Sequence, residues 1–152
     1  MAEQVAVDEG AVASCGLGRV DDADAFAVRG RADRPAEDVV RLAVDGAPLA
    51  LQVLVRVAQR GVLGLRLGPW RSREHVGGWA VLRSRPEEAV FGARGPLVAA
   101  RIVVTAGADA VTVTTLLRHE RPVARWLWAG LAPVHRAVAR FLLDRTARHL
   151  ER

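Results

Sequence analysis

The residue best suited to acid–base chemistry is His119, which is followed directly by Glu120. Histidine titrates near neutral pH, so its ring can accept and donate a proton under physiological conditions. The alternation of apolar residues along 111–119 places His119 on the same strand face as Val113 and Leu117. The sequence therefore predicts His119 as a catalytic acid or base at the mouth of a pocket. A sheet-edge histidine bound to a backbone carbonyl is the competing interpretation.

The other histidines do not form a metal-binding pattern. Together with His119, residues His75, His135 and His149 show neither HxH nor i, i+4 spacing, and Cys15 is the only cysteine. No glycine run matches a phosphate-binding loop, and no serine occupies a strand–turn–helix elbow. We therefore expect no metal and no cofactor. His135, in a predicted helix, and His75, in a predicted loop, are candidate ligand contacts, with structural and exposed histidines as the alternatives.

Four tryptophans supply flat apolar surface with an N–H donor, which suits an aromatic or polycyclic ligand. At least two are expected to pack in the core, and Trp126 and Trp128 are too close on one helix to face the same pocket. Arg83 shares a strand face with Trp79 and could anchor a carboxylate or enolate, with a solvated arginine as the alternative. The candidate ligand-binding residues are Trp70, His75, Trp79, Arg83, Ile102, Thr115, Leu117, Trp126, Leu131 and His135.

The elements that must position these residues begin with a strand and two helices. Residues 23–28 are predicted as a strand. The first helix starts near Pro35, with acidic residues in its first turn, and ends at Gly46. Pro48 opens the second helix, over 49–60. Glycine and proline recur in the stretch that follows, which is typical of a loop.

Four strands joined by short loops follow. They are predicted over 79–84, 88–93, 97–105 and 111–119. The loops are too short to hold crossover helices, so an antiparallel meander is expected. In the third of these strands, Val98, Ala100, Ile102 and Val104 share one apolar face, which should pack against a helix.

One long amphipathic helix, from Pro122 to Leu150, closes the chain. Its predicted buried stripe consists of Leu127, Leu131, Val134, Val138, Phe141 and Leu142. Its predicted solvated face carries Arg121, Arg125, Arg136 and Arg140, for which binding to a membrane surface or an acidic partner is the alternative. Pro133 is a potential kink. The elements together predict an α+β domain in which this helix closes over a curved antiparallel sheet around an apolar pocket.

The composition fits a single globular domain. The chain has 152 residues, of which 51% are hydrophobic and 26% charged. We predict a flexible N-terminal leader over 1–20 and one domain over 21–152. All 22 basic residues are arginines spread over every segment, as in a GC-rich bacterial gene, so the net charge of +5 does not indicate a nucleic-acid partner. The absence of a signal sequence or apolar span predicts a cytoplasmic protein that is not integral to a membrane.

The order of elements resembles the SRPBCC superfamily, whose START-like and pollen-allergen-like helix-grip fold wraps a curved sheet around a long C-terminal helix and a ligand cavity. The narrower resemblance is to an uncharacterised family within it, which in longer relatives follows an atypical short-chain dehydrogenase or NmrA-like domain. The residues that carry it are Val81, Leu82, Pro86, Glu88, Val90, Gly92, Val113, Thr114, Thr115, Arg118, Arg125 and the run 133–136. The resemblance spans roughly 24–148. It implies binding of an apolar or amphipathic small molecule, and its better-known members include polyketide cyclases and lipid carriers.

The sequence thus predicts a helix-grip domain that binds a hydrophobic or amphipathic small molecule, acting as a cofactor-independent, polyketide-cyclase-like tailoring enzyme. The alternative is a non-catalytic carrier, or an interaction module that docks on a dehydrogenase-like partner. A homodimer or an oxidoreductase partner is compatible with either prediction.

Overall fold

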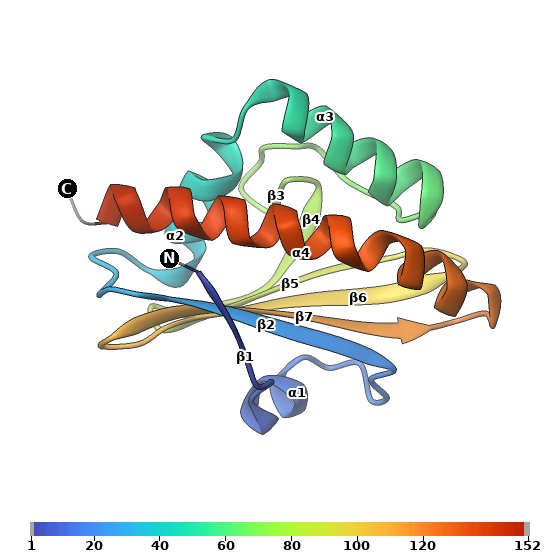
Figure 1. The fold of residues 1–152 in the computed structure, drawn as a ribbon, viewed down its shortest axis with the longest axis horizontal. Helices are drawn as coiled ribbons and strands as arrows, with labels where there is room; N and C mark the ends of the chain where they lie inside the picture. The colour runs from blue at the N-terminus through green and yellow to red at the C-terminus, as the bar shows by residue number, and fades with distance from the viewer. Residues whose placement is uncertain (1, 151–152) are drawn as a thin grey trace.

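One curved antiparallel sheet of seven strands organises the chain (Figure 1). The structure is a computed structural model that describes residues 2–150, with the side chain of Leu150 left out. Met1, Glu151 and Arg152, which fall within the predicted leader and domain, lie outside the described residues. In chain order the strands are β1 (Glu3–Val5), β2 (Asp22–Arg29), β3 (His75–Val76), β4 (Trp79–Ser84), β5 (Glu88–Arg94), β6 (Val98–Ala106) and β7 (Ala110–His119). Their order in the sheet is β1-β2-β7-β6-β5-β4-β3.

Helices cover both faces of this sheet. They are α1 (Glu9–Ser14), α2 (Ala36–Asp45), α3 (Leu49–Val57), the π-helical turn η1 (Ala58–Val62) and α4 (Val123–Leu150). Helices α2, α3 and α4 lie on one side, which we call the inner face, and α1 lies on the other (Figure 1). The predicted α+β class, the meander and the long C-terminal helix are confirmed.

Period-two alternation assigns the strand faces as predicted. In β6, Val98, Ala100 and Val104 are buried in the main core with Leu117 of β7. Phe26 of β2 belongs to the same core and is fully buried. Alternate residues point to opposite faces of a strand, so His119 lies on the inner face with Leu117. The sheet therefore carries the predicted catalytic residue on the side covered by α4.

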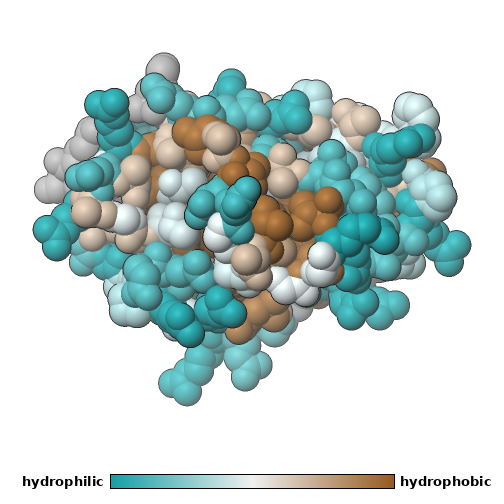
Figure 2. Space-filling view, turned by 90° about the horizontal axis from the view of Figure 1, so that it is seen from below, coloured by the Kyte–Doolittle hydropathy of each residue, from teal (hydrophilic) through white to brown (hydrophobic). Residues whose placement is uncertain are grey.

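The first twenty residues differ from the predicted flexible leader. Strand β1 pairs antiparallel with β2, and α1 packs on the outer face of the sheet. Cys15 and Leu17 are buried there against Val103 and Leu116. Figure 2, seen from this side, shows apolar surface in the middle of the face and hydrophilic side chains around its rim. A six-residue helix has too few turns to display a period, which is why the sequence pattern does not reveal it.

The buried stripe of α4 is not the one predicted. The helix buries Ala124, Trp128, Ala132, Leu143 and Ala147, whereas Val134 and Phe141 of the predicted stripe are exposed. Small alanine side chains let the helix axis come close to the sheet, and the bulkier aliphatic residues are left on its flank. The helix continues through Pro133.

The four arginines of the predicted solvated face are exposed, as predicted, and two of them also contact residues of the inner face. Arg136 lies 3.9 Å from Asp24, and the guanidinium of Arg140 lies 5.3 Å from the ring centroid of Phe26. An arginine can cover apolar surface with its stem while its charged head stays near water. The arginine stripe is therefore partly a packing surface.

Helix α4 does not cover the centre of the sheet. It packs mainly on β2 and α2, while α2 packs on β5 and β6. Ile102 and Val113, which belong to interior strands, remain partly exposed on the inner face. Arg145 of α4 donates a hydrogen bond of 2.7 Å to the Gly46 carbonyl, which ties the helix to the segment between α2 and α3. Ile102 and Val113 thus keep some exposed apolar surface on the inner face, while their cross-strand neighbours Phe91 and Val104 are buried.

The two neighbouring tryptophans of α4 provide a matched test of which face is buried. Trp128 is 9% exposed and Trp126 is 69% exposed. We expect Trp128→Ala to lower the free energy of unfolding by about 3 kcal/mol, because it leaves a cavity under the helix. Trp126→Ala should cost less than about 1 kcal/mol. Urea denaturation followed by circular dichroism measures both values, and equal losses would contradict the assigned face.

Candidate functional site

The sheet register aligns a row of inner-face residues that changes from polar to apolar. Asp24 of β2 lies opposite Thr115 of β7, which lies opposite Ile102 of β6. The row continues through Phe91 of β5 to Val81 of β4. Directly opposite residues in antiparallel strands have neighbouring side chains. We call Asp24, Thr115, Ile102, Phe91 and Val81 the inner row.

The polar end of the inner row is held by α4. The Asp24 side chain is only 5% exposed, and its Oδ1 lies 3.3 Å from Nε2 of His135. The ring of His135 in turn packs against Trp128, with centroids 5.1 Å apart. A buried carboxylate is costly unless it is paired, so Asp24 fixes the imidazole and the helix that carries it.

A second histidine–aspartate pair lies one step along the same strand face. Nε2 of His119 is 2.6 Å from Oδ2 of Asp22. A carboxylate only accepts, so Nε2 carries the proton and, in the neutral ring, Nδ1 keeps a lone pair. Among the described residues this Nδ1 is buried and has no hydrogen-bond partner. A buried ring nitrogen with a free lone pair can accept a proton from a bound molecule.

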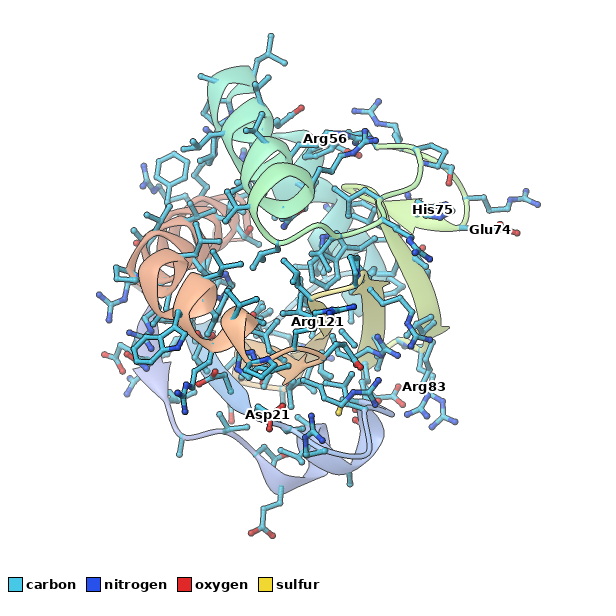
Figure 3. The ribbon with its side chains drawn as sticks, turned by 90° about the vertical axis from the view of Figure 1, so that its right-hand side faces the viewer. Asp21, Arg56, Glu74, His75, Arg83 and Arg121 are labelled. Atoms are coloured by element: carbon cyan, nitrogen blue, oxygen red, sulfur yellow. The ribbon has the colours of Figure 1, made fainter. Side chains whose placement is uncertain are left out.

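An open depression of about 320 Å³ adjoins His119 at this end of the sheet. It is lined by Arg19, Asp21, His119, Glu120, Arg121, Pro122 and Arg125. Figure 3 shows Asp21 and Arg121 at the end of the sheet that faces the viewer. Three guanidinium groups around one depression can accept a carboxylate or another anion.

The carboxyl of Asp21 stabilises the turn around His119. The backbone N–H of His119 donates a hydrogen bond of 2.7 Å to Oδ2 of Asp21, and Nε of Arg19 lies 3.2 Å from Oδ1. The hydrogen bond from His119 is the main cause that lowers the pKa of Asp21, and the charge of Arg19 adds to it against the opposing effect of burial. Folding therefore favours the ionised form of the Asp21 carboxyl.

Half of the predicted ligand contacts gather on the inner face. Thr115, Ile102 and Leu117 come from the sheet, and Leu131 and His135 come from α4, which packs on it. Thr115 and Ile102 are members of the inner row itself, and Leu117, Leu131 and His135 lie on the same face of the sheet or pack on it. With the inward-facing His119, they form the candidate site.

Of the other predicted contacts, Trp79 is buried in the same main core as Leu117, whereas Trp70, His75, Arg83 and Trp126 lie outside it. Trp79 is buried and donates its Nε1–H to Oε1 of Gln59 at 3.2 Å, and Trp70 lies under the guanidinium of Arg56. Nδ1 of His75 lies 3.0 Å from the Ser72 hydroxyl. Arg83 does not share the face of Trp79 as predicted, because a register shift between Val81 and Arg83 sets it opposite Val90, which is buried on the outer face. Its side chain pairs with Glu88 and points outward at the edge of the sheet (Figure 3). Trp126 is on the exposed side of α4. The tryptophans therefore do not form one ring around a pocket.

A second open depression, of about 520 Å³, lies at the opposite end of the strands. It is lined by Arg31, Ala32, Asp33, Arg34, Pro35, Pro86, Glu87, Ala106, Gly107 and Ala108. Neither depression contains a tryptophan or the middle of the inner row. The structure thus gives no support to a tryptophan-lined pocket in either place.

Three functional side chains were missed by sequence reasoning, namely Asp22, Asp24 and Arg136. A signal was present in the sequence. Asp22 and Asp24 lie on the same strand face as Phe26, and the alanines between them lie on the opposite face. Acidic residues on the apolar face of a strand require partners from another element. Those partners lie about a hundred positions away and could not be identified without the fold.

Comparisons with protein-family models, curated proteins and solved structures find no match to this chain. Across residues 2–150, no helix has the length and apolar character needed to cross a membrane. The geometry of the inner row and its two histidine–aspartate pairs therefore carries the functional argument.

The lowered pKa of Asp21 predicts a pH dependence of stability. A carboxyl with a lowered pKa in the folded state stabilises above its unfolded pKa, and this stabilisation is lost as the pH falls through the folded value. We expect Asp21→Asn, which keeps an acceptor oxygen, to remove up to about 1 kcal/mol of stability at neutral pH, and progressively less as the pH falls below the ordinary Asp value of about 4. Urea denaturation across this range measures the difference. Asp109→Asn, in an exposed loop, is the control and should leave the profile unchanged.

Proposed function

We propose that this chain binds an amphipathic small molecule with an apolar body along the inner row. The observation that supports this most is the row itself, in which a buried Asp24–His135 pair and Thr115 adjoin partly exposed Ile102. Small-molecule sites are mostly apolar, with a few convergent polar groups that fix orientation. The strand order and the C-terminal helix favour a helix-grip fold, in which such a site lies between helix and sheet.

The middle of the row and its polar end contribute differently to binding. Covering Ile102 in the row and Val113 in the neighbouring pair with ligand removes apolar surface from water, at about 25 cal/mol per Å². Thr115 supplies a hydroxyl at the polar end. The arginines beside His119 would receive an acidic group at the ligand's end. The ligand class is therefore an apolar molecule with oxygen functions and an anionic end.

The proposed chemistry is a cofactor-independent proton transfer by His119. Its Nδ1 takes a proton from an acidic C–H or O–H of the ligand, while Nε2–H remains hydrogen-bonded to Asp22. The Asp22 carboxylate then stabilises the imidazolium that forms, and the same proton returns to the ligand or its leaving group. Confinement between helix and sheet would hold the ligand folded, as a cyclase requires.

Blocking the centre of the row tests the binding site. We expect Ile102→Trp to lower the affinity for anilinonaphthalenesulfonate, an anionic aromatic probe, by about tenfold, or about 1.4 kcal/mol. The larger indole ring would occupy the surface of the inner row that the probe would cover. Titration followed by fluorescence measures the dissociation constant, and a thermal melt confirms folding.

The control for this experiment is Leu82→Trp. Leu82 is 52% exposed and lies beside Gly92, on the outer side of the β4–β5 hairpin. An added ring there should leave the affinity unchanged. Equal effects of the two substitutions would exclude the inner row as the probe's site.

The role of His119 is tested by identifying the small molecules that co-purify with the protein. With a catalyst, wild type should retain a product, and His119→Ala should retain the unconverted precursor, whose mass differs because cyclisation with dehydration expels water. Mass spectrometry of the extracted ligands measures this difference. Identical masses bound to both proteins would remove His119 from any reaction and support a carrier.

A further inference from the structure

Helix α3 is an amphipathic helix whose apolar side is exposed. It buries none of its residues. The side chains of Leu49, Val53, Leu54, Val57 and, in η1, Val62 are between 40% and 75% exposed. A surface helix of a globular protein normally turns its apolar stripe to the core. In α3 this stripe faces away from the protein.

The side of α3 that is turned toward the domain carries Gln52 and Arg56 together with the half-buried Leu51 and Val55. Gln52 donates to the Ala47 carbonyl at 2.9 Å, and Arg56 donates to the Gly68 carbonyl at 3.2 Å while covering the Trp70 ring. Figure 3 shows Arg56 on the flank of α3 that faces the following loop. A helix of nine residues has little stability alone. These polar contacts therefore hold α3 in an orientation that leaves its apolar side free.

The segment that contains this helix carries only positive charges, and Asp45 and Glu74 flank it. Residues 46–73 contain five arginines, at positions 56, 60, 66, 71 and 73, and no aspartate or glutamate. Because the whole chain has a net charge of +5, this segment accounts for all of it. Arg71 pairs with Asp45, just outside the segment, while Arg60, Arg66 and Arg73 are exposed.

We propose that α3 and its arginine flanks dock on the surface of an anionic lipid bilayer, with α3 lying in the plane of the interface. An exposed apolar stripe beside basic side chains is the combination that binds such interfaces. A second copy of the chain fits less well, because a two-fold contact through α3 would bring two segments of charge +5 together. This inference does not depend on the ligand proposed above.

Vesicle co-sedimentation of the full chain tests the proposal. The protein should bind vesicles of equimolar phosphatidylcholine and phosphatidylglycerol, and should bind phosphatidylcholine vesicles far less. Leu49→Ser/Leu54→Ser should lower the partition coefficient by about tenfold, because two anchoring side chains are lost. Arg60→Gln/Arg66→Gln should lower it by about 25-fold at low salt, at about fivefold for each arginine.

Matched controls separate this surface from general attraction. Leu82→Ser removes an exposed leucine on the β4–β5 hairpin, and Arg29→Gln/Arg31→Gln removes two exposed arginines outside the segment. Both should retain partition coefficients within about twofold of wild type. All variants change exposed side chains, and circular dichroism confirms that they fold.

Three results would each overturn the proposal. The first is equal binding to both kinds of vesicle, or none to either. The second is unchanged binding by Leu49→Ser/Leu54→Ser. The third is concentration-dependent self-association in sedimentation velocity that this double variant abolishes, because it would assign the stripe to a second copy.

Discussion

The pairing of Asp24 with His135 determines how α4 lies on the sheet. A carboxylate buried to 95% must find compensation, and its partners come from a helix more than a hundred residues further along the chain. Packing on β2 is the arrangement that brings His135 and Arg136 within reach of it. The same arrangement leaves Ile102 of β6 and Val113 of β7 partly exposed, while Val104 and Thr115 beside them are buried. One polar contact thus both anchors the helix and leaves Ile102 partly open on the inner face.

The strands were predictable because their information is local. Period-two alternation alone assigns Val98, Ala100 and Val104 to the inner face, and the short loops impose antiparallel pairing. The face of α4 was not predictable in the same way. Periodicity favours the largest aliphatic residues, whereas contact with β2 selected Ala124, Ala132 and Trp128, which fit under the helix.

In the candidate site, too, the features that depend on local sequence were predictable and those that depend on tertiary pairing were not. His119 follows from strand alternation, and the structure places it on the predicted face. Its partner Asp22 comes from the neighbouring strand, and pairing of β2 with β7 was not encoded by any short-range pattern. The tryptophans predicted as ligand contacts do not gather at one place, for a related reason: residue type does not say which face of an element is buried, and Trp79 is buried whereas Trp126 is exposed.

Helix α3 shows that an amphipathic pattern does not by itself determine which side of a helix is buried. Its sequence separates apolar from polar residues as a core-facing helix does, and the usual rule would bury Leu54 and Val57. The structure reverses that orientation because Gln52 and Arg56 find carbonyl acceptors in the flanking loops. Figure 1 places α3 on the same side of the sheet as α4 and the inner row. The exposed apolar side of α3 and the partly exposed Ile102 thus lie on one side of the sheet, and neither could be located from local periodicity alone.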